Sequence, residues 1–460
     1  MKNDRFSNHD TETRNLVLDF EQSLRQGKIQ FYDIDELEII VDYYLDVADN
    51  ASFAAAVDYA ERLYPDSSEV KIWRAHYHLN NHDTPRALAI LLDLHRREPD
   101  NTDVDYSLGE VYSEMGDPRK AIAHYLAAAA DGWQLARIYS NIAEEYYNLN
   151  DYPNALRYYR RSLDLDPLDS TTLFNYTDTC AAATCPEEAA TYLRQLLDTH
   201  PYCKEAWHCL GTIYAILGLT EKATDAFEYA IAIDPAFQPP YIELSNIYEC
   251  NGQPTQAANM LHRLCDHSAD PAPGLLLLGK LFLREENPTV ALEYLHSALR
   301  LQPHNADALA TLAMTEFQDG DLSQAELHAQ AALESNPDQS DALFCLAMSH
   351  YAQGSTDEAD AYFQRLIESP DCTEEHCHLY CHFLFDTASY NSLIDFAEES
   401  LSLYHHDDFY SAYLAAALFL TNRYKRLSQV LPDADPALLH KLCPRMWENP
   451  LVASILPKTE

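Results

Sequence analysis

A chain of 460 residues with 31 basic and 73 acidic residues carries a net charge of −42. Such a charge repels nucleic acid and anionic lipid, so we expect neither as a partner and favour a neutral or basic protein. The longest apolar stretch, residues 412–420, is far shorter than the roughly 20 residues of a membrane span. Eleven scattered cysteines without a C-x-x-C pair argue against a disulfide framework and favour the reducing cytoplasm.

Residues 1–33 predict an amino-terminal capping helix. Leu16, Phe20 and Leu24 recur at i, i+4 and i+8, and Gly27 follows as a helix terminator. The polar residues before Leu16 lack the apolar core of a secretory signal, which agrees with a cytoplasmic protein.

The chain then repeats itself every 34 residues. Alanine, proline and glycine each recur at multiples of this spacing, which indicates a solenoid of repeated helix pairs. The alanine series is unbroken and consists of Ala87, Ala121, Ala155, Ala189, Ala223, Ala257, Ala291, Ala325 and Ala359. The prolines are Pro65, Pro99, Pro167, Pro201, Pro235, Pro303 and Pro337. Two glycine series are Gly109, Gly211 and Gly279, and Gly116, Gly218, Gly252, Gly320 and Gly354.

Each series has a physical interpretation in a pair of antiparallel helices. We expect the first glycine series to face the alanine slot of the second helix, so that the two backbones approach closely. The second glycine series should supply the residue with positive φ that ends the first helix. Proline cannot continue a helix and should therefore end the second one.

The residues in these slots resemble the tetratricopeptide repeat (TPR). The resemblance is fullest in residues 204–237, with Trp207, Leu210, Gly211, Tyr214, Gly218, Ala223, Phe227, Ala230 and Pro235 in the signature slots. It implies an all-α, right-handed superhelical solenoid of about 11–12 antiparallel helix pairs. Eleven units would fill residues 34–407, and residues 408–460 would hold a degenerate twelfth unit and a carboxyl-terminal cap. The units would begin at Ile34, Ser68, Thr102, Ala136, Ser170, Lys204, Gln238, Ala272, Ala306, Ser340, Glu374 and Asp408.

The resemblance also implies a function, because TPR arrays bind a peptide or a helix in a concave groove lined by the first helices. We therefore expect a non-catalytic scaffold or adaptor that binds a partner protein or peptide. Acids fill ten of the twenty-five groove slots in the first five units. The candidate groove residues there are Asp35, Glu38, Asp42, Asp103, Tyr106, Glu110, Glu114, Glu144 and Asp178. Later units contribute Asn246, Lys280, Arg284, Phe317, Phe344, Met348 and Tyr351.

This uneven lining suits a partner segment with a basic part and an apolar part. A second interpretation is that an acidic protein shows acids on every exposed helix face. A third is a regulatory subunit whose groove is filled by its own terminus until a partner displaces it.

An enzyme is not expected, because an independent catalytic domain of about 100 residues finds no room outside the array. No cofactor is expected either, because the glycines outside the repeat are too scattered for a phosphate-binding loop. The segment from Cys372 to His382 is the alternative, a metal-dependent sensor or enzyme. Cys377 with Cys381, and His378 with His382, have the i, i+4 spacing of zinc ligands. The repeat instead assigns both cysteines to the core and both histidines to the groove.

Overall fold

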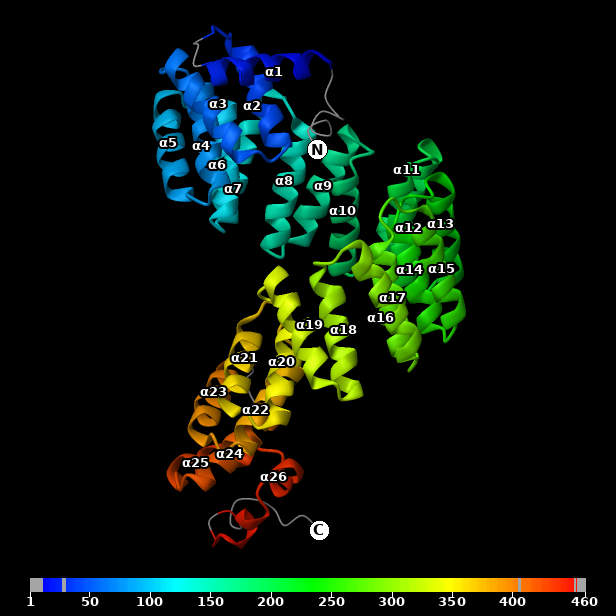
Figure 1. Ribbon diagram of the computed structural model, residues 1–460. Helices are drawn as coiled ribbons and strands as arrows, with labels where there is room; N and C mark the ends of the chain where they lie inside the picture. The colour runs from blue at the N-terminus through cyan, green and yellow to red at the C-terminus, as the bar shows by residue number, and fades with distance from the viewer. Residues whose placement is uncertain (1–10, 27–29, 404–406, 451, 453–460) are drawn as a thin grey trace. The chain divides into compact units, whose positions relative to one another are not determined.

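The computed structural model describes residues 11–26, 30–403, 407–450 and 452, and every regular element among them is helical (Figure 1). The chain divides into two compact units after Glu243. The first unit contains α1 (Thr11–Gln26), followed by the pairs α2 (Ile34–Asp46) and α3 (Asn50–Leu63), α4 (Ser68–Asn80) and α5 (Thr84–Arg97), α6 (Thr102–Glu114) and α7 (Pro118–Ala128), α8 (Leu135–Asn148) and α9 (Tyr152–Leu165), α10 (Ser170–Ala182) and α11 (Pro186–Thr199), and α12 (Lys204–Ile216) and α13 (Thr220–Ile233). A short 3-10 helix, η1 (Ala129–Asp131), follows α7.

The division between the units falls inside α14 (Pro239–Cys250). The second unit continues with α15 (Pro254–His267), α16 (Ala272–Arg284), α17 (Pro288–Leu301), α18 (Ala306–Asp319), α19 (Leu322–Ser335), α20 (Ser340–Gln353), α21 (Thr356–Glu368), α22 (Glu374–Asp386), α23 (Tyr390–Leu403), α24 (Asp408–Leu420) and α25 (Tyr424–Val430). It ends with η2 (Leu431–Asp433), α26 (Pro436–Leu442) and η3 (Pro444–Glu448). None of the described helices is long and apolar enough to cross a membrane.

A left-handed residue ends the first helix of each pair, and these residues are 34 positions apart along the chain. Glycine holds five of the slots, as predicted, and other residues hold the rest. Residues that carry a side chain are disfavoured in the left-handed conformation by roughly 1–2 kcal/mol. The turn between the two helices therefore imposes this conformation on them. The residues are Ala48, His82, Gly116, Asn150, Thr184, Gly218, Gly252, Glu286, Gly320, Gly354, Ala388 and Asn422. Asn422, the last of them, lies between α24 and α25. This helix pair stands where the sequence predicts a degenerate twelfth unit.

The second helix of many pairs begins at an acidic cap. The side chains of Asp49, Asp83, Asp117 and Asp151 each accept a hydrogen bond from the backbone N–H three residues further on. Such a cap satisfies a donor that the first turn of a helix would otherwise leave without a partner. A share of the chain's acidic residues is therefore structural.

The close contact inside each pair differs in detail from the prediction. A Cβ atom on Gly109 would lie 2.5 Å from the ring of Tyr125, and one on Gly211 would lie 2.6 Å from the ring of Phe227. These rings stand four residues after the alanine slot, so the nearest atoms to both glycines belong to a ring that the prediction did not include. The ring lies over the glycine because no side chain fills that space. At Gly279 the nearest atoms to a Cβ position are those of Leu295, and the carbonyl oxygen of Ala291, in the alanine slot, lies 3.5 Å from the same position.

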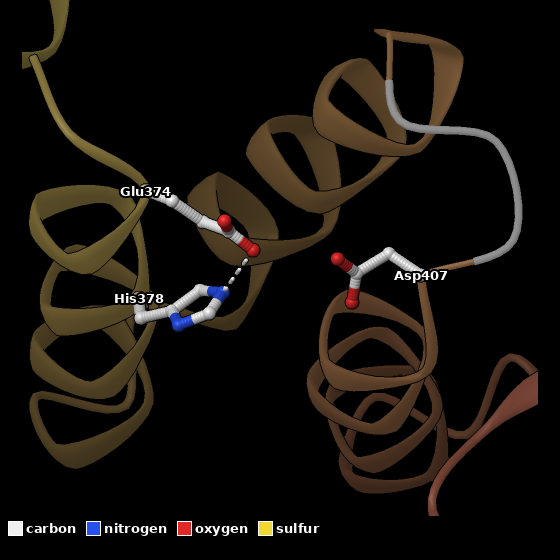
Figure 2. A group of neighbouring side chains, drawn as sticks. All are labelled: Glu374, His378 and Asp407. Atoms are coloured by element: carbon white, nitrogen blue, oxygen red, sulfur yellow. Dashed lines mark ion pairs between the residues drawn. The ribbon is translucent and has the colours of Figure 1, made fainter. Parts of the chain in front are cut away.

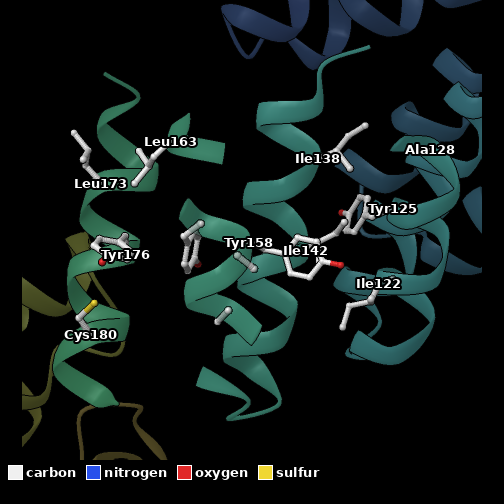
Figure 3. Close-up of a cluster of buried hydrophobic side chains, with 14 of the residues drawn as sticks. Ile122, Tyr125, Ala128, Ile138, Ile142, Tyr158, Leu163, Leu173, Tyr176 and Cys180 are labelled. Atoms are coloured by element: carbon white, nitrogen blue, oxygen red, sulfur yellow. The ribbon is translucent and has the colours of Figure 1, made fainter. Parts of the chain in front are cut away.

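Buried side chains from neighbouring helices form hydrophobic clusters in the first unit. One cluster involves α1 to α4 and another involves α4 to α12. Figure 3 shows part of the latter, with Tyr125 of α7, Ile142 of α8 and Tyr158 of α9 among its side chains. At the amino-terminal end, Val17 and Phe20 of α1 are fully buried, whereas Leu24 is exposed. Gly27, the predicted terminator, lies outside the described residues. In the second unit, Leu439 of α26 and Met446 of η3 are buried in the terminal core, as a cap requires.

Candidate functional site

The first helices of the first four pairs line a cavity of about 690 Å³ in the first unit. Seven of the predicted groove residues line it, whereas Asp35 and Asp178 do not. The seven are Glu38, Asp42, Asp103, Tyr106, Glu110, Glu114 and Glu144. The slots assigned from the repeat thus converge on one concave surface, because residues four apart share one face of each helix.

Four acids of the cavity already have partners. Glu69 accepts a hydrogen bond from the hydroxyl of Ser67 at 2.5 Å. Glu110 lies 3.3 Å from Nε2 of His76 and 3.6 Å from the guanidinium of Arg137. Glu114 lies 3.4 Å from Nδ1 of His82. Glu145, which is almost fully buried, accepts a hydrogen bond from the hydroxyl of Ser113. The carboxylates of Glu110, Glu114 and Glu145 contribute to packing between repeats as well as to the charge of the cavity.

Four other acids of the cavity, Glu38, Asp42, Asp103 and Glu144, form no ion pair with any described residue of the chain. The pKa of each is raised above its ordinary value, first by burial. Neighbouring carboxylates raise these pKa values further, because like charges disfavour ionisation. For Asp42, the charge of nearby His76 partly opposes this rise. The first unit therefore holds a set of uncompensated negative charges on one concave surface.

Trp133 is a cavity residue that the sequence analysis missed. Its side chain lines the cavity and is 62% exposed. It lies in the turn before α8, where Asp131 accepts hydrogen bonds from the backbone N–H of Trp133 (2.8 Å) and the hydroxyl of Thr102 (2.7 Å). The sequence does carry a signal, because Trp133 occupies the slot that Pro99 and Pro167 hold in the adjacent repeats.

The predicted groove residues of the second unit are more strongly engaged in packing. Phe317, Phe344, Met348 and Tyr351 are half-buried against the core. The Tyr351 hydroxyl donates a hydrogen bond to Asp386, 2.9 Å away. Part of each of these four side chains therefore remains accessible.

The predicted basic residues of the second unit are partly neutralised. Arg284 forms an ion pair with Glu249 at 2.8 Å. Lys280 is half-buried and Asn246 is exposed. Because its charge is compensated by Glu249, Arg284 is not available as an isolated anion-binding group.

The alternative, a joint metal site of cysteines and histidines, is not assembled among the described residues. Figure 2 shows the group that could offer ligand atoms, Glu374, His378 and Asp407, whose atoms lie within 4.8 Å of one another. The His378 ring stacks on Phe409 at 3.7 Å and its Nε2 lies 3.6 Å from Glu374. Asp407 accepts hydrogen bonds from the first backbone N–H groups of α24.

The other members of the predicted cluster lie apart from this group. His382 lies 3.2 Å from Asp386, at the end of the same helix. Cys381 is fully buried, as the repeat predicts, and burial raises the pKa of its thiol. A site that shares one metal ion between His378 and His382 is therefore not favoured by this arrangement.

Curated proteins with detectable similarity match only parts of the chain. The TPR repeat-containing protein YpiA of Bacillus subtilis is 21% identical over 248 residues, covering 46% of this chain and 58% of that protein. The protein O-mannosyl-transferase TMTC1 of Homo sapiens is 24% identical over 157 residues, covering 34% of this chain and 17% of that protein. The chain thus covers less than two thirds of the length of both relatives.

Solved structures of helical repeat proteins also match. The APC/C hetero-tetramer Cut9–Hcn1 matches with a TM-score of 0.40 and 16% identity, covering 88% of this chain and 93% of that chain. A tetratricopeptide repeat protein from Parabacteroides merdae matches with a TM-score of 0.38 and 19% identity, covering 54% of this chain and 98% of that chain.

Family models provide the most specific comparison. A tetratricopeptide repeat model matches residues 74–136, 185–236, 276–328 and 310–371, and a second model of this repeat matches residues 136–168. Together the matched segments cover more than half of the chain, and they lie over α4 to α9, α11 to α13 and α16 to α21. The chain belongs to the tetratricopeptide repeat family.

Proposed function

We propose that this chain is a non-catalytic scaffold that binds a basic segment of a partner protein in the acidic cavity of its first unit. The TPR fold supports a role in protein–protein interaction in general. The observation that supports the specific proposal is the group of four cavity carboxylates, Glu38, Asp42, Asp103 and Glu144. Their pKa values are raised, and they form no ion pair with the part of the chain that the structure describes.

A cationic partner segment would lower the free energy needed to ionise these partly buried, closely spaced carboxylates. A lysine or arginine within about 4–6 Å of a carboxylate favours the charged form and lowers its pKa. Binding would therefore be favoured in two ways: by attraction between opposite charges, and by weaker repulsion among the carboxylates. Trp133 adds an exposed aromatic ring beside these acids, and aromatic rings attract cations by about 0.5–1 kcal/mol at exposed sites.

The second unit supplies the proposed contacts for apolar side chains of the partner. The half-buried residues Phe317, Phe344, Met348 and Tyr351 would contribute through buried apolar area. Eleven cysteines without a C-x-x-C pair favour a reducing compartment, and a cytoplasmic location is part of the proposal.

A labelled oligolysine peptide tests the proposal when its affinity is measured over a range of salt concentrations. In the test variant, Asp42, Asp103 and Glu144 are each changed to lysine. We expect its affinity to fall at least about tenfold, since three contacts each worth roughly 0.2–1 kcal/mol become repulsive. The salt dependence should also flatten, because fewer charges are left to screen.

A matched control carries the same change in total charge on second helices of the first unit. Asp164 of α9, Asp198 of α11 and Asp225 of α13 are exposed, lie outside the cavity and can each be changed to lysine. This control should retain most of the affinity. If both triple variants weaken binding equally, only the total charge matters and the cavity is not the binding site.

A further inference from the structure

Two cysteine thiols lie side by side at the start of α22. The Sγ atoms of Cys372 and Cys377 are 3.6 Å apart, and both side chains are partly accessible to solvent. A disulfide has an S–S distance of about 2.05 Å, so the sulfurs would have to approach by about 1.6 Å. Formation of the bond requires this movement of the two side chains.

The local fold explains why these thiols meet. Thr373 caps α22, and its hydroxyl accepts a hydrogen bond from the backbone N–H of His376, while the His376 ring accepts one from the backbone N–H of Thr373. This reciprocal arrangement is a capping box. The residue before such a cap and the fourth residue of the helix commonly pack together as a hydrophobic staple, and these positions hold Cys372 and Cys377.

The capping box at the start of α2 has apolar side chains at the same two staple positions. Asp33 and Glu36 form the equivalent reciprocal bonds at the start of α2. The staple positions there hold Tyr32 and Leu37, and both are buried apolar side chains. At α22 the same geometry brings together two groups that can form a covalent bond.

We propose that Cys372 and Cys377 are a reversible oxidation site, at which exchange with a small-molecule disulfide converts the staple of α22 into a covalent one. One thiolate attacks the small disulfide and releases one small thiol, which leaves a mixed disulfide on the protein. The second cysteine then attacks the protein sulfur and releases the other small thiol. The two protein thiols are oxidised, the small disulfide is reduced to two thiols, and the two protein protons end on those thiols.

The two neighbouring thiols also influence each other. Burial, followed by the neighbouring Cys377 thiol, raises the pKa of Cys372. Once one of the two sulfurs is bonded to the small thiol, it can no longer ionise. Its contribution to the raised pKa of the other thiol then disappears, which favours the second step.

The covalent staple would affect a surface that the repeat assigns to the groove. The His376 ring, which takes part in the capping box, stacks on Phe344 of α20 at 5.5 Å. A disulfide closing the short loop between Cys372 and Cys377 restricts opening of this first helical turn. Oxidation should therefore slow backbone hydrogen exchange at the beginning of α22.

The full chain is equilibrated with glutathione and glutathione disulfide at several ratios, and its thiols are then alkylated and mapped by mass spectrometry. At the ratio where half of Cys250, an exposed single thiol, carries glutathione, the Cys372–Cys377 disulfide should be nearly complete. Hydrogen exchange in the first turn of α22 should slow in this state and recover after reduction.

Two controls make the result specific. Cys180 and Cys185 have the same sequence spacing, but Cys180 is fully buried, so this pair should stay reduced. In the Cys372→Ser variant, Cys377 should instead accumulate the glutathione adduct. The proposal is overturned if Cys372 and Cys377 stay reduced where Cys250 reacts, if both carry glutathione, or if oxidation leaves hydrogen exchange in α22 unchanged.

Discussion

Arg137 is the only lysine or arginine among the described residues that line the cavity of the first unit. Its guanidinium lies over the ring of Tyr106, 5.2 Å from the centroid, and 3.6 Å from Glu110. One aromatic face and one carboxylate of the cavity are thus already engaged by a cation of the chain itself. Arg137 shows which kind of contact a basic partner would make, and it competes for that contact.

Replacement of Arg137 by alanine should therefore tighten the binding of an oligolysine peptide. We expect a gain of about two- to fivefold, since the contact of one exposed cation with a ring and a carboxylate is worth about 0.5–1 kcal/mol. Arg161→Ala is the matched control, because Arg161 lies over Tyr158 at 5.2 Å outside the cavity and the change in net charge is the same. Equal gains for both variants would show that Arg137 does not occupy the binding surface.

The sequence predicts cavity residues through their repeat slots, but it does not predict which carboxylates are free. Glu110 and Glu144 hold the same slot in neighbouring repeats. Glu110 lies close to Arg137 and to a ring nitrogen of His76, whereas Glu144 forms no ion pair with a described residue. Pairing depends on His76 and Arg137, which come from other helices. Trp133 escaped detection because it replaces a proline, and the proline slot is read as a helix end rather than as a binding position.

At the scale of helices, the 34-residue period was sufficient to predict most of the architecture. First helices begin at the predicted Ile34, Ser68 and Thr102 and at most later positions, because each repeat carries its own turn and cap. The largest local departure surrounds α7, which ends at Ala128 and is followed by η1. The turn that contains Trp133 replaces the end of that helix, so the period alone could not predict it.

The close contact between paired helices makes Gly211 sensitive to any side chain. Gly211→Leu should lower the free energy of unfolding, because a Cβ atom already lies 2.6 Å from the Phe227 ring. Overpacking costs about 1–3 kcal/mol, and the larger values apply where backbones approach closely. The gain in helix propensity, about 1 kcal/mol, offsets only part of this cost.

Chemical denaturation of both variants, followed by circular dichroism, checks this expectation. Ala215→Leu is the control, because Ala215 is exposed on the same helix, and its effect should stay within about 0.5 kcal/mol. An unchanged midpoint for Gly211→Leu would mean that the helices can separate without loss, and the contact would not be a packing constraint.

For the whole molecule, the net charge of −42 attracts any basic probe to many surfaces. Affinity alone therefore does not distinguish the cavity from the remaining acidic surface. The distinguishing property is local: the cavity gathers unpaired carboxylates from several helices, whereas acids such as Asp117 and Asp151 cap helices. A basic partner should bind where the carboxylates are uncompensated.

The most direct test is a map of the carboxylates that a bound basic peptide contacts. Oligolysine is cross-linked to the full chain with a zero-length carbodiimide reagent, and the linked sites are identified by mass spectrometry. Each yield is divided by the yield with a small amine, because a raised pKa alone increases reaction with the reagent. We expect the normalised cross-links to concentrate on Glu38, Asp42, Asp103 and Glu144. Equal normalised yields at Asp164, Asp198 and Asp225 would contradict it.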